Sequence, residues 1–229
     1  QTRDTGKAAI QDPLGTKLTY KKLIVGAQVL GAKLAPMLPP VGQSVGVLLP
    51  NSAGVAVTFF ALQTMGRVPA MLNFTAGAAN VIAACKVANV TVVLTSRAFV
   101  EKGHFEALVQ AISTVARIVY LEDVRATVTF LDKIKGLAQG GKTQVDRDCN
   151  APAAILFTSG SEGLPKGVVL SHRNLLANCA QSLTRVACNG SDKVFNALPV
   201  FHSFGLTAGL LMPLVAGVPV YLYPTPLHY

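Results

Sequence analysis

Short apolar runs alternate with amphipathic stretches through the first half of the chain, and this alternation constrains the fold more than any other feature. The runs have the length and flanking turn residues of buried strands, and they cover 44–50, 68–73, 91–95 and 117–121. The amphipathic stretches predict helices at 21–38, 51–65, 76–88 and 97–113. Because neighbouring parallel strands need a long crossover connection, the pattern predicts an α/β protein with mostly parallel sheets flanked by helices.

The second half continues this pattern, with apolar runs at 153–157 and 168–170 on either side of a loop rich in Gly and Ser. A helix is expected after Ser171, with an apolar face made of Leu175, Leu176, Cys179, Leu183, Val186 and Ala187, and a strand at 194–199. The stretch 204–223 is long enough to cross a membrane, but its prolines, glycines and β-rich end favour a buried helix and strand. The polar segment 123–150 is predicted to be a connector and a candidate subdomain boundary.

The distribution of charge and of cysteines argues against a nucleic-acid-binding protein and against a metal site. The net charge is +9, but the basic residues are scattered from Arg3 to Lys193 and do not interleave with aromatic residues, which argues against a nucleic-acid partner. An anionic small substrate, an acidic carrier protein or an anionic membrane surface fits such dispersed charge better. The four cysteines are far apart and lack metal-ligand spacing. They are therefore predicted to be reduced and packed in a cytosolic protein, and no metal ligand is predicted.

The loop at 158–167, TSGSEGLPKG, combines hydroxyl groups, three glycines and one lysine. Glycines let backbone N–H groups approach an anion, hydroxyls can donate to its oxygens, and Lys166 adds a positive charge, so the loop suits a polyphosphate. It is not a Walker A loop, because Pro165 precedes the lysine and no Ser or Thr follows it, and it is not a Rossmann fingerprint. On composition alone, a surface turn rich in Ser and Gly is an equal alternative.

The string TSGSEGLPKGV at 158–168 closely resembles the phosphate-binding signature of the adenylate-forming enzymes, which include acyl-CoA synthetases, luciferases and adenylation domains. LTYKKL at 18–23 and the segments 49–77 and 197–229 resemble further parts of the same family. Glu162 and the strings PVFHSFGLT at 199–207 and YPTPLHY at 223–229 are most similar to one branch. That branch comprises the acyl-ACP synthetase domains of bacterial acylglycerophosphoethanolamine acyltransferase/acyl-ACP synthetases.

The resemblance implies an activity and a domain organisation. Residues 1–229 are expected to be the truncated front part of a large N-terminal AMP-binding domain, with the C-terminal domain and an upstream acyltransferase domain absent. The parent protein is expected to use ATP and Mg²⁺ to convert a fatty acid into an acyl-adenylate, and to transfer the acyl group to the pantetheine thiol of acyl carrier protein or CoA. The expected setting is phospholipid acyl recycling in the cytoplasm, with peripheral contact at the cytoplasmic face of the bacterial inner membrane. The isolated chain is expected to be inactive and to self-associate.

The resemblance also implies a set of site residues. The ATP phosphates are expected at Thr158, Ser159, Gly160, Ser161, Glu162, Gly163 and Lys166, catalytic roles at Lys166 and His202, and an acyl pocket at Phe201, His202, Phe204 and Leu206. The charge of Glu162 would oppose the phosphates, so its alternatives are a contact with Lys166, a place at a metal, or a solvated surface. For His202 and the acyl-pocket residues, the alternative is ordinary core packing.

Two other functions compete with this one. The string from His202 to Gly205 resembles the end of the nucleophile elbow of an α/β-hydrolase, but Phe201 stands where that motif needs Gly. Downstream of it, His228 is present but no Asp follows, so a catalytic triad cannot be completed. For the isolated chain, a non-catalytic nucleotide- or phosphate-binding module remains the alternative to an enzyme.

Overall fold

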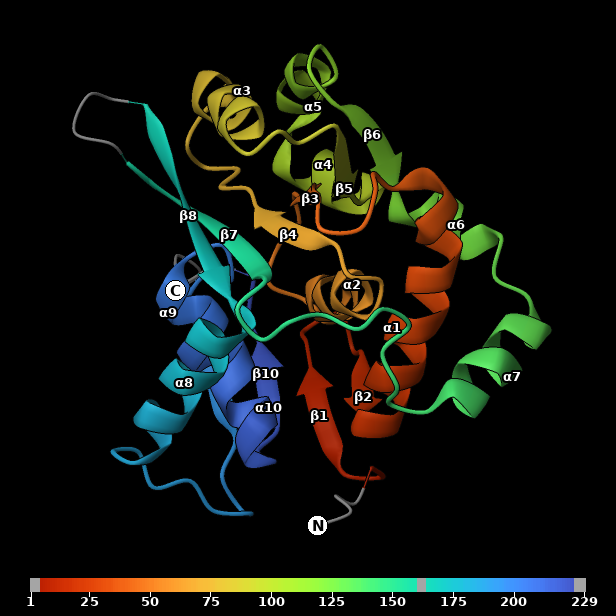
Figure 1. Ribbon diagram of the computed structural model, residues 1–229, viewed down its shortest axis with the longest axis vertical. Helices are drawn as coiled ribbons and strands as arrows, with labels where there is room; N and C mark the ends of the chain where they lie inside the picture. Colours follow the sequence, from red (N-terminus) through yellow and green to blue (C-terminus); the bar gives the residue numbers. More distant parts are fainter. Residues whose placement is uncertain (1–4, 160–163, 225–229) are drawn as a thin grey trace.

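The computed structural model describes residues 5–159 and 164–224. It contains two sheets with helices packed on and between them (Figure 1). Neighbouring strands are parallel in both sheets, except where β2 pairs with β1 and β8 with β7. The predicted α/β class, with mostly parallel sheets flanked by helices, is confirmed.

The larger sheet has six strands in the order β6-β5-β3-β4-β7-β8. Its strands are β3 (Ser44–Val47), β4 (Val68–Met71), β5 (Val92–Thr95), β6 (Arg117–Tyr120), β7 (Pro152–Ser159) and β8 (Pro165–Ser171). The central strands β3, β4 and β5 are almost wholly apolar because both of their faces are covered by helices. The strands β7 and β8 form an antiparallel hairpin at one edge.

The smaller sheet joins the two ends of the described chain. Its order is β2-β1-β10-β9, with β1 (Ala8–Gln11), β2 (Lys17–Thr19), β9 (Val194–Asn196) and β10 (Val220–Leu222). In its parallel pairing, Ile10 lies opposite Val220. Both side chains are fully buried, so this sheet closes one side of the core.

Helices cover both faces of the larger sheet. On one face lie α3 (Ala78–Val87), α4 (Arg97–Gly103) and α5 (Glu106–Ile112), which share a buried apolar cluster with β4 and β5. On the other face lie α1 (Tyr20–Leu34) and α2 (Ala53–Thr64), with a short 3₁₀ turn after α1 at Ala35–Met37. In Figure 1, α2 is seen end-on between the two sheets. Its apolar residues are buried on all sides, as expected for a helix enclosed by two layers.

Two predicted elements differ from the structure in the region 97–150. The helical prediction at 97–113 is confirmed except for one break: α4 and α5 are separate helices, because His104 adopts the left-handed conformation with φ +53° and ends α4. The segment predicted as a connector contains α6 (Leu121–Ala126) and α7 (Phe130–Gln139). The strands before and after it, β6 and β7, belong to the same sheet. The subdomain boundary there stays a prediction.

The C-terminal third runs from the hairpin into α8 (His172–Leu183), which Ser171 caps as predicted by accepting a hydrogen bond from the backbone N–H of Asn174. The predicted apolar face is too wide. Leu175 and Cys179 are buried, whereas Leu176 faces solvent and α8 ends before Val186. A buried helix and strand are confirmed at 204–223, as α9 (Ser203–Leu206), a π-helical turn (Thr207–Leu211), α10 (Met212–Ala216) and β10. Within the described ranges, no helix has the length and apolar character needed to cross a membrane.

The cysteines behave differently from one another. Cys85 and Cys179 are buried, and burial raises the pKa of the Cys85 thiol to about 11. Cys149 is exposed, so the prediction that all four cysteines are packed is wrong at this position. Cys149 lies in the loop before β7, where its sulfur accepts a hydrogen bond from the Arg173 guanidinium at 3.1 Å.

Candidate active site

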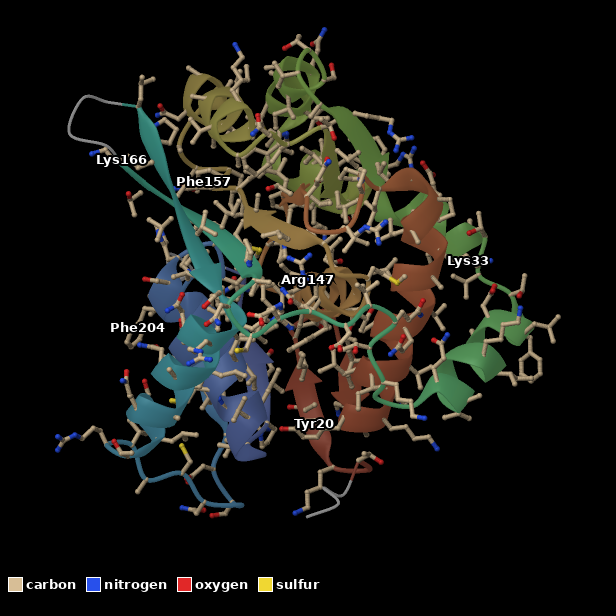
Figure 2. All side chains as sticks on the ribbon, in the orientation of Figure 1. Tyr20, Lys33, Arg147, Phe157, Lys166 and Phe204 are labelled. Atoms are coloured by element: carbon tan, nitrogen blue, oxygen red, sulfur yellow. The ribbon has the colours of Figure 1, made fainter. Side chains whose placement is uncertain are left out.

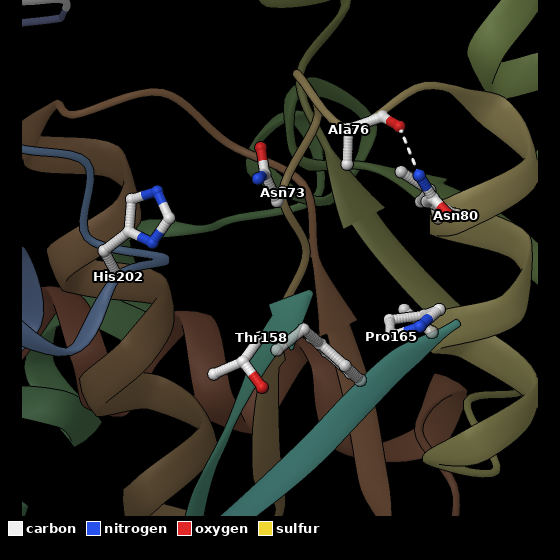
Figure 3. Close-up of a pocket in the computed structure, with 9 residues that line it drawn as sticks. Asn73, Ala76, Asn80, Thr158, Pro165 and His202 are labelled. Carbon is white, nitrogen blue, oxygen red and sulfur yellow. Dashed lines mark hydrogen bonds between the residues drawn. The ribbon is translucent and has the colours of Figure 1, made fainter. Parts of the chain in front are cut away.

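A cavity of about 370 Å³ opens where the hairpin meets the carboxyl end of β4. It is lined by Asn73, Ala76, Asn80, Val81, Ala84, Phe157, Thr158, Pro165 and His202. Figure 3 shows His202 on one side of the cavity and Pro165 on the other, with Asn73 between them. In sheets of this type, ligands bind beyond the carboxyl ends of the parallel strands, and this cavity has that position.

The hairpin places Thr158 on the cavity wall and Lys166 opposite it in the antiparallel ladder, next to the lining residue Pro165. These two residues are direct partners in the antiparallel ladder, so their side chains leave the same face of the hairpin. The segment that joins the two strands therefore begins and ends beside the cavity. Lys166 is exposed and is the only charged residue in β7 and β8 (Figure 2). The predicted phosphate-binding residues Gly160, Ser161, Glu162 and Gly163 lie outside the described residues.

The other side of the cavity is fixed by a buried asparagine. Asn51 is 2% exposed and lies just before the capping residue of α2. Its amide donates to the carbonyl of Leu198 at 2.7 Å, and its side-chain oxygen accepts from the N–H of Val200 at 2.9 Å. The N–H of His202 in turn donates to the carbonyl of Pro199 at 3.0 Å. The start of α2 thereby holds the turn that presents His202 to the cavity.

A second buried asparagine, Asn196 at the end of β9, also holds this turn. Asn196 ends β9 because its side chain accepts from the N–H of Leu198 at 3.1 Å and donates to the carbonyl of Gly205 at 3.2 Å. The predicted strand at 194–199 is therefore too long. The carbonyl oxygens of Pro199 and Leu198 leave no room for a side chain at Gly205. His202 thus lies at the start of α9, with both flanks of its turn held by buried amides.

Charge at the site is concentrated on the hairpin. His172 lies at the far end of β8 from Lys166, and partial burial, with a smaller effect of Arg147, lowers its pKa. His172 is therefore mostly neutral at neutral pH, and the charge of the described hairpin strands comes from Lys166. A single exposed cation beside a hydroxyl group is suited to an anionic ligand.

A family model described as AMP-binding enzyme matches residues 1–228. The chain belongs to the AMP-binding enzyme family. Relatives include 4-coumarate–CoA ligase 2 of Oryza sativa subsp. japonica, which is 31% identical over 198 residues that cover 80% of this chain and 35% of that protein. Sulfoacetate–CoA ligase of Cupriavidus necator is 30% identical over 212 residues, covering 89% of this chain and 39% of that protein. The chain thus spans little more than a third of the length of these relatives.

Solved structures agree with this assignment. ATP-bound MatB from Rhodopseudomonas palustris matches with a TM-score of 0.78 and 25% identity, covering 98% of this chain and 44% of that chain. VinN in complex with 3-methylaspartate matches with a TM-score of 0.80 and 20% identity, covering 96% and 58%, which shows the fold alone. The adenylate-forming family predicted from the sequence is confirmed. None of these relatives is named for an acyl carrier protein, so the acyl-ACP synthetase branch stays a prediction.

The predicted acyl-pocket residues have different environments. Phe201 is buried and packs edge-on against Phe74, with ring centroids 5.1 Å apart. Leu206 is fully buried in the main core and does not line the cavity. Phe204 is 67% exposed. Of the predicted acyl-site residues, the structure places His202 on the cavity wall, opposite the hairpin.

Sequence reasoning missed the residues that β4 and α3 contribute to the cavity. Asn73 follows β4 and forms a turn in which its side-chain oxygen accepts from the N–H and hydroxyl of Thr75. Asn80 lies on α3, where its amide donates to the carbonyl of Ala76 at 2.9 Å (Figure 3). The available signal was a polar residue, Asn73, at the carboxyl end of the strand predicted at 68–73, since that position is at the ligand-binding edge of such sheets.

Replacing Asn51 tests how the turn of His202 is held. Asn51→Ala is expected to lower the free energy of unfolding by about 2–3 kcal/mol, because it leaves the buried N–H of Val200 and the partly buried carbonyl of Leu198 without partners. Urea denaturation of the two proteins measures the difference. The matched control is Asn80→Ala, which removes one exposed hydrogen bond and should change stability by less than about 0.5 kcal/mol. Equal stability of Asn51→Ala and the unmodified chain would contradict the assigned role.

Proposed function

We propose that the protein containing this chain is an AMP-forming acid–thiol ligase. A carboxylate oxygen of the acid attacks the α-phosphorus of ATP, the bond to pyrophosphate breaks, and an acyl-adenylate forms. A pantetheine thiol then attacks the acyl carbon, and AMP leaves. The observation that carries the proposal is the family match over residues 1–228, together with a hairpin that places Thr158 on the cavity wall and pairs it with Lys166.

The hairpin supplies the phosphate side of this site. The first step brings an anionic carboxylate towards a polyanion, so its barrier depends on positioning and on stabilising the charge that passes to pyrophosphate. The ammonium group of Lys166 and the hydroxyl of Thr158 leave the same face of the hairpin and suit the β- and γ-phosphates. Ser159, Gly160, Ser161, Glu162 and Gly163 are assigned to the same phosphates on the sequence pattern.

Mg²⁺ fits the proposal as a partner of the nucleotide. Among the residues that the structure describes, no three His, Cys, Asp or Glu side chains gather into a metal site. Mg²⁺ is commonly bound through substrate phosphates with only one or two protein carboxylates. When bound there, it would neutralise phosphate charge beside Lys166 and Thr158.

His202 lies on the side of the site that we assign to the carboxylic acid substrate. It is exposed at the cavity wall opposite the hairpin, where a carboxylate can approach between them. Behind it, Phe201 and Leu206 are packed in the core, and Phe204 offers an exposed apolar surface next to the turn. We assign His202 to positioning the carboxylate and the three apolar residues to shaping the acyl end of the site.

The finer assignment is a fatty acid as the substrate, with acyl carrier protein or CoA as the acceptor, in phospholipid acyl recycling. The support is the resemblance of the strings at 199–207 and 223–229 to the acyl-ACP synthetase branch. The second of these strings extends beyond the described residues. In this assignment the parent protein works in the cytoplasm, in peripheral contact with the cytoplasmic face of the bacterial inner membrane.

A substrate screen tests the proposal. The intact protein is incubated with ATP and Mg²⁺, with either CoA or acyl carrier protein, and with one acid at a time: a long-chain fatty acid, 4-coumarate, malonate or sulfoacetate. The expected result is AMP formation that requires an acid and is fastest with the fatty acid. ATP binding without acid-dependent AMP would favour the non-catalytic nucleotide-binding alternative.

The 229-residue chain alone is expected to form no AMP above a Lys166→Ala control.

Self-association of the chain through its C-terminal third is also expected. The edge strand β8 exposes Val168 and Val169, and the edge strand β9 exposes Phe195, whose side chain is 63% accessible. Exposed apolar edge strands pair readily with other chains. Light scattering should show oligomers at high concentration, and Val169→Lys should return the chain towards the monomer. A clean monomer before any substitution would contradict this expectation.

A further inference from the structure

Helix α7 presents an apolar face to solvent. Its large apolar side chains are the most exposed cluster of their kind on one helix: Phe130 is 75%, Leu131 66%, Ile134 48% and Leu137 50% accessible. With roughly 3.6 residues per turn, these positions form one stripe along the helix. Figure 1 shows α7 at the margin of the molecule beside α1, away from the hairpin. The stripe therefore belongs neither to the core nor to the candidate active site.

The opposite side of α7 is fixed to α1, so the direction of the apolar stripe is set. Gly136 is buried, and a Cβ there would come within 2.7 Å of the Val29 side chain. The Asp132 carboxylate pairs with the Lys33 ammonium at 2.8 Å and accepts from the N–H and hydroxyl of Thr129 at 2.7 Å. These contacts, the Lys33 hydrogen bond first, hold the pKa of Asp132 well below its usual range. The acidic group of α7 is thus held by α1 and by the cap of its own helix.

The charges beside the stripe are positive. Lys133 precedes Ile134 and Lys135 follows it, so the two exposed lysines lie on either flank of the stripe. Lys142, also exposed, follows shortly after the end of the helix. An apolar stripe between lysines is the pattern of helices that lie in a membrane interface, with apolar side chains among the acyl chains and ammonium groups at the headgroups.

We propose that α7 is a docking helix for an anionic lipid bilayer. Four protruding apolar side chains on a helix at the margin of the molecule suit a deformable lipid surface. A protein partner would need a groove matched to that shape, and an acidic protein is therefore the weaker candidate. A second copy of the chain is disfavoured as well, because two-fold pairing through α7 would bring the flanking lysines of both copies together. A bilayer rich in anionic lipid satisfies both the stripe and the lysines.

Vesicle flotation tests the proposal with the 229-residue chain. Flotation is chosen because self-associated protein without lipid stays at the bottom of the gradient. The chain should float with vesicles of about one third phosphatidylglycerol in phosphatidylcholine, and not with phosphatidylcholine alone or at high salt. Leu131→Glu combined with Ile134→Glu, and separately Lys133→Glu combined with Lys135→Glu, should each lower binding about tenfold or more.

Matched substitutions elsewhere on the chain distinguish binding through α7 from a general effect of surface charge or surface hydrophobicity. Leu176→Glu replaces an exposed leucine on α8, and Lys86→Glu combined with Lys102→Glu reverses the same number of exposed lysines on α3 and α4. These variants should float as the unmodified chain does. All the substituted positions are exposed, and circular dichroism with thermal melting verifies that each variant is folded.

A tryptophan reporter gives a second readout, because the chain contains no Trp. Phe130→Trp should shift its emission to shorter wavelength with anionic vesicles, whereas Phe195→Trp on β9 should not. Unchanged flotation of the Leu131/Ile134 variant, or no flotation of the unmodified chain, would overturn the proposal. So would an emission shift of Phe130→Trp with acyl carrier protein but not with vesicles, or a loss of self-association caused by the α7 substitutions alone.

Discussion

Gly205→Ala should destabilise the chain by about 3 kcal/mol or more, because there is no room for a methyl group at this position. A Cβ at Gly205 would overlap the carbonyl oxygen of Pro199 and lie 2.7 Å from that of Leu198. Both atoms belong to the backbone of the turn that presents His202, and Asn51 and Asn196 hold that backbone by buried hydrogen bonds to Val200 and Gly205. The turn has to move to admit the methyl group. Urea denaturation measures the loss of stability.

The matched control is Gly190→Ala in the loop before β9. A Cβ there meets no atom within 4 Å, and the residue does not require the left-handed conformation. This substitution should leave stability within about 0.5 kcal/mol of the unmodified chain. If Gly205→Ala were as stable as Gly190→Ala, the close packing of α9 against the His202 turn would be wrong.

Local patterns predicted most of the helices and strands, but not the way in which the chain ends meet. The runs at 44–50, 68–73 and 91–95 are strands because each is apolar throughout, which is what a strand buried on both faces requires. The smaller sheet pairs β1 with β10 across almost the whole described sequence. Such pairing depends on packing between distant residues, and no pattern within a short window reveals it.

The prediction for 97–139 missed the break between α4 and α5 and the helix α7, and both omissions have local reasons. The break between α4 and α5 depends on the left-handed conformation of His104, which a non-glycine residue adopts uncommonly. Helix α7 was missed because its segment is rich in polar residues. Its capping box at Thr129 and Asp132 was nevertheless readable in the sequence. Its exposed apolar stripe became evident only once α1 was seen to cover the opposite side.

The candidate site was predicted where its chemistry is local in the sequence and missed where it is not. Thr158 and Lys166 lie in one contiguous motif, and the hairpin places them opposite each other. His202 was selected from a second motif, and the fold brings it to the same cavity. Asn51 was expected to start α2, but its two hydrogen bonds to the turn before α9 span the chain from one motif to the other. Sequence spacing carries no sign of that contact.

Lys166→Ala in the intact protein should slow adenylation about 100-fold, which is the usual effect of removing one preorganised group that stabilises transition-state charge. Because Lys166 is exposed, the substitution should leave the fold nearly unchanged. The binding of the acid should also be nearly unchanged. The loss should therefore appear in the rate rather than in affinity for the acid. Lys166→Arg should recover part of the rate, because the positive charge returns with a different shape.

The exchange of labelled pyrophosphate into ATP tests the central claim most directly, because it follows the adenylation step alone. The rate is measured in the intact protein with and without a long-chain fatty acid, for the unmodified protein, Lys166→Ala and the control Lys22→Ala at an exposed position of α1. The account predicts exchange that requires the acid, is about 100-fold slower in Lys166→Ala and is unchanged in Lys22→Ala. Exchange at the unmodified rate in Lys166→Ala would contradict it, because the hairpin beside the cavity would then not be where the phosphates bind.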